Sequence, residues 1–298
     1  MKTLLIFSFI SQIILSQSLQ VFDQNTKSGI PYAIVMVDTT GYYTDADGRL
    51  TIKLNKFDSI SIEHLNYHKL KINKIKDSLF LKPKAYNLDE IEILNYDALR
   101  PKRLKTPRGF LSTVIVKQTE ALTCLCLKKE KYLNSKITEL RFEVSGSKYH
   151  IKKEKLDKQK AVLRLNLYKN EKNFPGQSIY SYAPVTFSLK KVFDNKSYFV
   201  FDLKHKPIEL TKEGFCFGLE HLEFINDKNN AYRIKELFME SYLDKSKYFK
   251  AKTYLNYPLH PKYDSLISNK RFLKESFKNL NIKKDAPIFI PEMIIYQE

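Results

Sequence analysis

The stretch Gly41–Leu54, "GYYTDADGRLTIKL", decides the fold, because it can be interpreted as a calcium loop or as a turn followed by a β-strand. A calcium loop of the EF-hand type needs a glycine at its sixth position and a bidentate glutamate at its twelfth. Here a glycine follows Asp45 by only three residues, and the place for the closing carboxylate falls among lysines. An Asp-Gly pair supplies the positive φ of a tight turn, and apolar and polar residues then alternate from Leu50 to Leu54. We therefore predict a β-hairpin at Asp47-Gly48 and no calcium site.

The same alternation recurs on both sides of this turn, at spacings of roughly 8–12 residues and without a helical segment. Strands are predicted at residues 33–38, 49–54, 58–65, 68–72 and 87–94. This pattern is typical of a small antiparallel β-sandwich.

Five ordered segments in this part of the chain carry a resemblance to a known family. They are "VFDQNTKSGIPYAIVMV", "GYYTDADGRLTI", "DSISIEHLNYHKLKI", "LFLKP" and "NLDEIEI", which begin at residue 21 and end near residue 95. Together they resemble the carboxypeptidase-regulatory-like domain of exported proteins of Bacteroidetes-type bacteria, a transthyretin-like β-sandwich. Asn66 stands where that family usually has glycine, and asparagine tolerates a left-handed backbone. The resemblance implies scaffolding or recognition and not peptide hydrolysis.

The N-terminus has the pattern of a secretory signal peptide. Lys2 supplies the positive charge, Leu4–Leu15 is apolar, and Ser16–Ser18 is a small-residue exit. The apolar run of about 12 residues is shorter than the roughly 20 that a membrane-spanning helix needs. We expect cleavage between about Gln17 and Gln20, and an exported protein of the periplasm or the outer membrane with no transmembrane segment in its mature chain.

The charge is distributed unevenly along the chain. Residues 19–100 carry 11 basic and 11 acidic side chains, whereas residues 101–298 carry 39 and 22, so the net charge of +18 comes almost entirely from the second part. The run "RPKRLKTPRGF" at the transition combines proline, glycine and five basic residues, a composition typical of a linker. We predict a signal peptide at 1–18, a regulatory-like sandwich at 19–97, a basic linker at 98–110 and a second domain at 111–298.

The second domain is also β-patterned. Leu163, Leu165 and Leu167 alternate with Arg164, Asn166 and Tyr168, and two further segments, 198–203 and 215–219, alternate in the same way. Gly218 within the last segment indicates a bulge or a close backbone approach. We predict a larger antiparallel, jelly-roll-like β-sandwich with little helix, an amphipathic helix at 268–281 and a closing strand at 286–297, so the fold class is all-β.

A second resemblance concerns the triplet Gly218-Leu219-Glu220. The arrangement is similar to a β-sandwich that often follows the regulatory-like domain, in which a glycine-aromatic strand ends in a Gly-hydrophobic-Glu triplet. His221 stands where an aromatic residue is expected.

The cysteines do not form the dense framework of a small secreted domain. Cys124 and Cys126 are two residues apart, so on a strand they share a face and have a poor geometry for bridging each other. We predict that Cys124, Cys126 and Cys216 are buried or half-buried thiols.

The sequence contains no complete motif of the known catalytic families that we considered. No histidine opens a zinc-protease motif, and the sequence holds no nucleophile elbow, phosphate loop or dinucleotide-binding glycine pattern. His221 and Glu223 lie two apart and would share a strand face as two ligands or an acid–base pair, but no third partner is identifiable, so a polar pair at a strand end is favoured. We predict no enzyme, no catalytic, cofactor-binding or metal-binding residues, and no cofactor.

The remaining functions are binding functions. Lysine-rich stretches with tyrosine and phenylalanine, such as "KSKYFKAKTYLNY", suit anionic glycans, lipids or nucleic acid. Specific base and phosphate contacts prefer arginine, so nucleic acid is disfavoured. We expect an exported, non-catalytic recognition or scaffold protein of the cell envelope, which binds an envelope protein or an anionic glycan or lipid surface. The alternatives are an accessory role in glycan or peptide processing and, more remotely, an unrecognised hydrolase.

Overall fold

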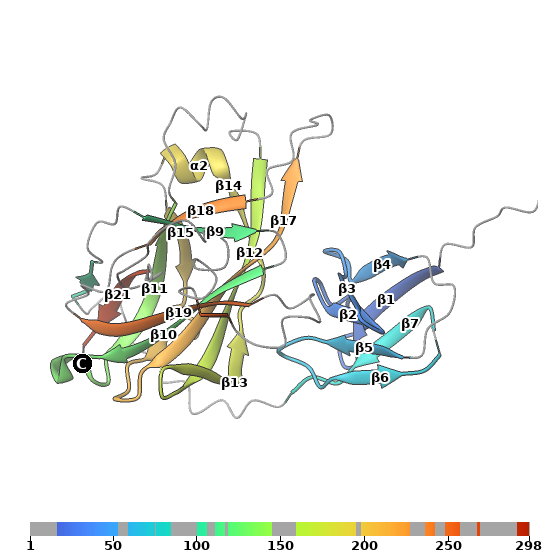
Figure 1. Cartoon of the computed structure of the whole chain (residues 1–298), viewed down its shortest axis with the longest axis horizontal. Coiled ribbons are helices and arrows are strands. Elements are labelled where there is room, and N and C mark those ends of the chain that lie inside the picture. The colour runs from blue at the N-terminus through green and yellow to red at the C-terminus, as the bar shows by residue number, and fades with distance from the viewer. Residues whose placement is uncertain are drawn as a thin grey trace, which may run out of the picture. The chain divides into compact units, whose positions relative to one another are not determined.

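The chain folds into two compact units in a computed structural model (Figure 1). The first comprises Met1–Asn87 with Leu259–Pro261, and the second Leu88–Pro258 with Lys262–Glu298. Regular structure is nearly all β, which confirms the predicted all-β class. The residues that the structure describes are 17–52, 59–74, 76–84, 100–105, 111–116, 119–144, 159–194, 198–226, 236–241, 248–256, 267–268 and 291–297. In these ranges no helix has the length and apolar character needed to cross a bilayer.

The first unit is a sandwich of a three-stranded sheet, ordered β4-β1-β7, and a four-stranded sheet, ordered β3-β2-β5-β6. The strands are β1 (Gln17–Asp23), β2 (Ile34–Val37), β3 (Thr40–Tyr43), β4 (Arg49–Ile52), β5 (Ile60–Glu63), β6 (Leu70–Ile72) and β7 (Ser78–Leu81). Apolar side chains of both sheets form one core, and Leu19 and Val21 of β1 are 1% and 0% exposed in it. Leu50 and Ile52 are buried while Arg49 and Thr51 are exposed, as the alternation predicts.

The stretch around Gly48 forms the predicted turn, but the predicted hairpin is wrong. The Asp45 carboxylate accepts hydrogen bonds from the backbone N–H groups of Asp47 (2.9 Å) and Arg49 (2.8 Å), and Gly48 has a φ of 76°. A Cβ on Gly48 would lie 2.6 Å from the carbonyl oxygen of Val21, so the position requires glycine. β3 before the turn pairs with β2, whereas β4 after it pairs with β1 in the other sheet. The chain therefore passes from one sheet to the other at this turn. Alternation within one strand does not show whether the next strand belongs to the same sheet or to the other one.

Two further expectations for the first unit are wrong. β1 pairs in parallel with β7, so the sandwich is not wholly antiparallel. Asn66 is not among the residues with positive φ; the turn there closes through a hydrogen bond from the Tyr67 N–H to the His64 carbonyl (3.0 Å). The predicted strand at 87–94 lies outside the described residues.

The second unit contains two larger sheets. The seven-stranded sheet has the order β13-β12-β17-β10-β19-β20 with β14 also on β12, the five-stranded sheet has β15-β11-β21-β8 with β16 on β11, and β9 pairs with β18. The elements are β8 (Lys102–Leu104), β9 (Leu111–Val116), β10 (Thr119–Leu127), η2 (Glu130–Tyr132), β11 (Lys136–Glu143), β12 (Gln159–Glu171), β13 (Phe174–Ser181), β14 (Val185–Ser188), α2 (Leu189–Asp194), β15 (Tyr198–Asp202), β16 (Ile208–Glu209), β17 (Phe215–Asn226), β18 (Glu236–Ser241), β19 (Phe249–Asn256), β20 (Ile267–Ser268) and β21 (Glu292–Tyr296).

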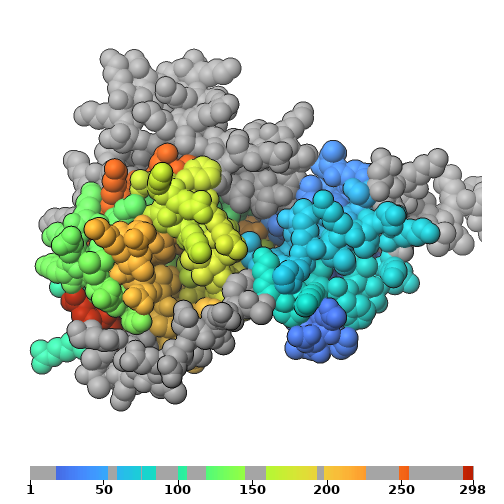
Figure 2. All heavy atoms as spheres, turned by 90° about the horizontal axis from the view of Figure 1, so that it is seen from below, coloured from blue at the N-terminus to red at the C-terminus, as the bar shows by residue number. Residues whose placement is uncertain are grey.

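The two larger sheets of the second unit share one apolar core. Phe142 of β11 contacts Phe217 of β17, with ring centroids 5.6 Å apart, and Phe201 of β15 at 5.7 Å. The strand pairs of these two sheets are antiparallel, as predicted. In Figure 2, residues of the β12–α2 segment and of β17 lie side by side on one surface of this unit.

The segment predicted as a linker, 98–110, contains β8. This strand pairs with β21, and Leu104 is 2% exposed in the second core. Lys102 and Arg103 are exposed, because β8 is the last strand in its sheet order, and basic residues are common on such edges. The charge run therefore belongs to a strand of the second unit, and contacts divide the chain earlier, between Asn87 and Leu88. The predicted helix at 268–281 lies outside the described residues except for Ser268 in β20, and β21 forms within the predicted closing strand.

Candidate functional site

The seven-stranded sheet has an inner face toward the apolar core and an outer face with polar side chains. On β17, Phe215, Phe217 and Leu219 belong to the core, so the alternate residues, among them Gly218 and Glu220, point outward. The leucines of β12 face the core in the same way, which places its intervening polar residues on the outer face. We call the following residues the outer-face cluster: Glu120, Arg164, Asn166, Tyr168, Ser181 and Glu220.

The strand register brings these residues together from four strands. Glu220 of β17 lies directly opposite Arg164 of β12 on one side and Glu120 of β10 on the other. One row along, Asn166 lies opposite Gly218 and, on its other side, Ser181 of β13. The members of the cluster therefore come from positions up to 100 residues apart in the sequence, and pairing of the strands assembles them.

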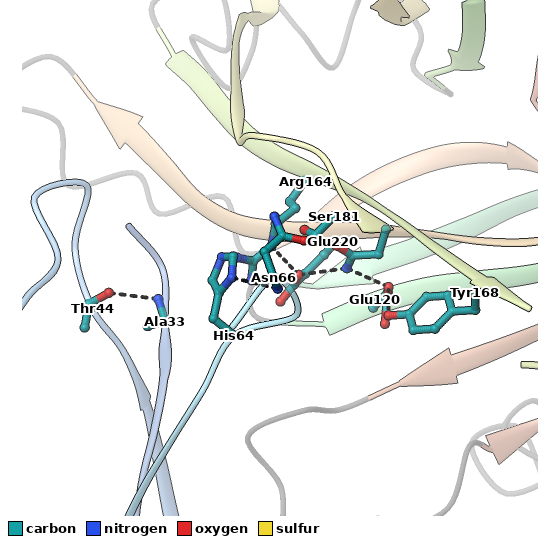
Figure 3. A network of polar contacts seen from close by, with 10 residues as sticks. Ala33, Thr44, His64, Asn66, Glu120, Arg164, Tyr168, Ser181 and Glu220 are labelled. Carbon is teal, nitrogen blue, oxygen red and sulfur yellow. Dashed lines mark hydrogen bonds and ion pairs between the residues drawn. The ribbon is translucent and has the colours of Figure 1, made fainter. Parts of the chain in front are cut away.

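Hydrogen bonds connect the cluster (Figure 3). The Asn166 Nδ2 donates to Glu120 Oε1 (2.8 Å) and to Glu220 Oε2 (3.2 Å), so one amide joins the two carboxylates. The Tyr168 hydroxyl donates to Glu120 Oε1 (2.8 Å), and the Ser181 hydroxyl donates to Asn166 Oδ1 (2.7 Å). Ser181 thereby fixes the orientation of the amide that both carboxylates use.

Gly218 makes room for the Glu120 carboxylate. A Cβ at this position would overlap the Glu120 side chain from Cγ to Oε1. Since Gly218 lies between Leu122 and Asn166 in the ladder, its missing side chain lets Glu120 lean across β17 toward Asn166. The predicted bulge or close backbone approach is therefore wrong: the ladder has no register shift at Gly218, and the close approach is made by the side chain of Glu120.

Arg164 and Glu220 form a buried ion pair. The Arg164 Nε lies 2.9 Å from Glu220 Oε2, and both side chains are 4% exposed. Breaking such a pair by removing one partner costs about 3–5 kcal/mol, because a buried charge is left behind. The cluster itself holds two carboxylates and one guanidinium, so the neutral donors Asn166 and Tyr168 supply part of the stabilisation that the carboxylates need.

Tyr168 is held in its neutral form. Burial raises the pKa of its hydroxyl well above the ordinary value, and the charge of Glu120, the hydrogen bond to Glu120 and the charge of Glu220 raise it further, against a smaller opposing effect of Arg164. A neutral phenol is a hydrogen-bond donor. Tyr168 therefore acts as a fixed donor to Glu120.

A disulfide lies next to the cluster, which corrects the prediction that Cys124 and Cys216 are thiols. These residues are cross-strand neighbours on β10 and β17 and are bonded to each other, whereas Cys126 is a half-buried free thiol. The Cys126 Sγ donates to Asn173 Oδ1 (3.0 Å). Pairing of Cys124 with Cys126 was correctly rejected, but the partner strand that brings Cys216 opposite Cys124 was unknown.

The tip of the β12–β13 hairpin covers part of this face. Lys172 and Asn173 have φ of 57° and 65°, which gives a sharp turn. The Tyr254 hydroxyl of β19 donates to the Asn173 carbonyl (2.5 Å), and the Phe174 ring packs against the Tyr254 ring at 5.4 Å. Since β12, β17 and β10 separate β13 from β19 in the sheet order, the hairpin tip folds over the outer face.

His221 and Glu223, the predicted polar pair, lie at a register shift. His221 pairs with Leu163 and Glu223 with Val162, so Leu222 is an extra residue in β17. The shift interrupts the simple alternation on which their shared face was predicted. His221 is 0% exposed with its ring 4.3 Å from that of Phe224, while Glu223 is half-buried.

Metal binding finds no support in the described part of the chain, where no three histidine, cysteine, aspartate or glutamate residues are grouped so that they could hold an ion. The outer-face cluster offers a carboxylate pair instead, the arrangement that glycoside hydrolysis uses as acid and base or nucleophile. That chemistry needs space for a sugar between the carboxylates. Here Glu120 and Glu220 are 2% and 3% exposed and share one amide donor, an arrangement that stabilises the sheet.

The sequence was compared with known proteins. It matches no protein-family model and no curated protein sequence. Both resemblances, to the carboxypeptidase-regulatory-like domain and to the sandwich that often follows it, therefore stay predictions.

Proposed function

We propose that the protein is an exported, non-catalytic recognition or scaffold protein of the cell envelope. The observation that carries this proposal is the disulfide between Cys124 and Cys216. Disulfides persist in oxidising compartments such as the periplasm and are rare in the cytosol. The bond joins two residues that are 92 positions apart in the sequence, so it stabilises the fold by restricting the unfolded chain.

The arrangement of the first strand supports removal of a signal peptide. Leu19 is buried in the first core, and Gln17 and Ser18 pair with β4. A mature chain that begins between Gln17 and Leu19 keeps Leu19 and Val21 in this core. Cleavage beyond Leu19 would remove a buried side chain from the core, which favours a cleavage site at or before this residue.

The outer-face cluster supports a non-catalytic role. Its carboxylates, guanidinium, amide and hydroxyls hydrogen-bond to one another, and Glu120, Arg164, Asn166 and Glu220 are buried. Side chains held in this way fix the sheet and are not presented to a substrate. Recognition would then use the surfaces of the two sandwiches.

The proposal is tested by expressing the full chain, and a version without residues 1–18, in a bacterium with a periplasm. Denatured protein from each is treated with a maleimide-linked polymer, with and without prior reduction. The exported protein should start between Gln17 and Leu19 and react at one thiol, Cys126, before reduction and at three after it. The shortened version, retained in the cytosol, should react at three thiols in both cases. Retention of Met1 or three reactive thiols in the unreduced full-length product would contradict the proposal.

A further inference from the structure

Four lysines and two tyrosines gather where β10 turns into β11. We call Lys102 of β8, Lys128, Lys129 and Lys131 of the turn, Tyr132 of η2 and Tyr248 before β19 the lysine–tyrosine patch. The rings of Tyr132 and Tyr248 are in edge contact, with centroids 5.8 Å apart. The backbone N–H of Lys128 donates to the Tyr248 carbonyl (2.8 Å), which ties the turn to β19.

Three ammonium groups lie over these two rings. Lys102 Nζ and Lys131 Nζ are 4.8 Å and 5.2 Å from the centroid of the Tyr132 ring, and Lys129 Nζ is 5.8 Å from that of Tyr248. Attraction between a cation and an aromatic face holds each lysine in place. The lysine side chains are exposed, so the patch presents several positive charges at fixed positions.

Glu130 of η2 lies between Lys129 and Lys131 in the sequence, so the patch has a surplus of positive charge of four lysines over one glutamate. Elsewhere lysines pair with carboxylates, as Lys136 does with Glu209 and Lys69 with Glu63. Within the described parts of the chain, no ion pair joins Lys102, Lys129 or Lys131 to an acidic side chain. Neighbouring charges of the same sign repel, and a surface of negative charge relieves this repulsion.

The chemistry of the patch fits lipid headgroups better than sugars. Sugar recognition uses an open aromatic face with directional hydrogen bonds, but the Tyr132 ring is 3% exposed and lies beneath two ammonium groups. Lysine is a compact point charge, suited to the diffuse potential of an anionic bilayer surface and not to bidentate contacts. Attraction of this kind needs no pocket.

We propose that the lysine–tyrosine patch docks the second unit on a membrane surface with anionic headgroups. The inference rests on the proposed envelope function, and it identifies the part of the protein surface that would bind the membrane. Each lysine near such a membrane strengthens binding about fivefold, so three together account for about a hundredfold.

The test uses the full mature chain with K102Q/K129Q/K131Q in the patch. The matched control, K160Q/K190Q/K191Q, removes the same charge at the other end of the sheet. Lys160 lies near the start of β12, where it pairs with Ser188 directly before α2. The other end of β12 lies near the patch, because Lys169 pairs with Phe215, which in turn pairs with Leu125 near the end of β10. All six lysines are exposed, and equal melting temperatures of the variants would show that folding is unaffected.

Binding is measured by co-sedimentation with phosphatidylglycerol-containing vesicles and with neutral phosphatidylcholine vesicles, at low and high salt. The wild type should bind only the anionic vesicles and lose binding at high salt. The patch variant should bind about a hundredfold more weakly, and the control variant within about threefold of the wild type. Equal weakening in both variants would overturn the inference, because net charge alone would then explain binding.

A second arm adds soluble acidic polysaccharide. Tighter binding of the wild type to polysaccharide than to anionic vesicles would overturn the assignment to lipid. Unchanged vesicle binding by the patch variant, in a protein that is exported and disulfide-bonded, would refute the patch and leave the proposed function standing. Failure of export would refute the proposed function whatever the vesicles show.

Discussion

Both faces of the seven-stranded sheet in the second unit hold buried side chains, and the two faces differ in the chemistry of these side chains. The inner face consists of leucine and phenylalanine from β12 and β17, which pack against the five-stranded sheet. The outer face holds an ion pair, a second carboxylate, an amide and a phenol within hydrogen-bonding distance of one another.

This difference affects how the sequence determines which strands pair and in which register. An apolar face accepts any side chain of similar volume, so it constrains strand register only weakly beyond the choice of face. A hydrogen-bonded face is directional, because Arg164 must lie opposite Glu220 and Asn166 opposite Gly218. We infer that the inner face supplies most of the stabilisation and the outer face fixes the pairing of β10, β12 and β17.

The largest expected effect comes from breaking the ion pair on the outer face. Arg164→Met leaves Glu220 buried without its guanidinium and should lower the free energy of unfolding by about 3–5 kcal/mol. Leu165→Met, the next residue on the same strand but on the inner face, should cost about 1.5 kcal/mol or less. Urea unfolding of the full mature chain measures both.

Adding Glu220→Leu to Arg164→Met should restore part of the lost stability, since the uncompensated carboxylate is then gone. A cost of Arg164→Met no greater than that of Leu165→Met would show that the outer face is no more specific than the inner one.

The next effect concerns the space that Gly218 leaves for Glu120. Gly218→Ala would displace the carboxylate from Asn166 and Tyr168, and the loss of these charge-assisted hydrogen bonds should cost about 3 kcal/mol. The matched control is Gly176→Ala, whose Cβ would also meet a glutamate side chain, that of Glu171.

Glu171 is exposed and can rotate away, so Gly176→Ala should cost about 1 kcal/mol or less. Combining Gly218→Ala with Glu120→Ala should cost less than the sum of the two, because the overlap is removed. Equal costs at the two glycines would contradict the assignment of Gly218 as a space for Glu120.

The sequence predicted the strands better than their partners. Alternation placed Arg164, Asn166 and Tyr168 on one face of β12, and the Gly-hydrophobic-Glu triplet singled out Gly218 and Glu220. The sequence did not show that the residues of β12 contact those of β17. Alternation assigns each side chain to a face of its own strand and contains no information on which strand lies next to it.

The same limit explains the other misses. The Cys124–Cys216 disulfide and the passage from β3 to β4 depend on strands that are far apart in the sequence or belong to different sheets. The basic run at 98–110 is predicted as a linker because its charge suits solvent, whereas burial of Leu104, pairing with β21 and the ion pair between Arg103 and Glu292 hold part of it as an edge strand. A disulfide between strands, a crossing between sheets and an edge strand can be recognised only when the pairing and register of the strands are known.

The smallest expected effect is a change in alkaline stability at Tyr168. In the unfolded chain the phenol ionises near a pKa of about 10. In the folded chain burial and Glu120 raise its pKa well above that, so the folded state keeps a proton that the unfolded state loses. The stabilisation is therefore fully present below pH 10 and declines above it, by about 1.4 kcal/mol per pH unit for this one group.

Tyr168→Phe removes this group and its hydrogen bond to Glu120, at a cost of about 1.5–3 kcal/mol at neutral pH. The variant lacks the ionisation of Tyr168, so its stability should fall less steeply above pH 10, and the gap to the wild type should narrow there. Urea unfolding from pH 7 to pH 11 measures the gap, and its constancy between pH 7 and pH 9 is the internal control. Parallel curves up to pH 11 would mean that Tyr168 ionises alike in both states, and that the outer face does not hold it as a donor.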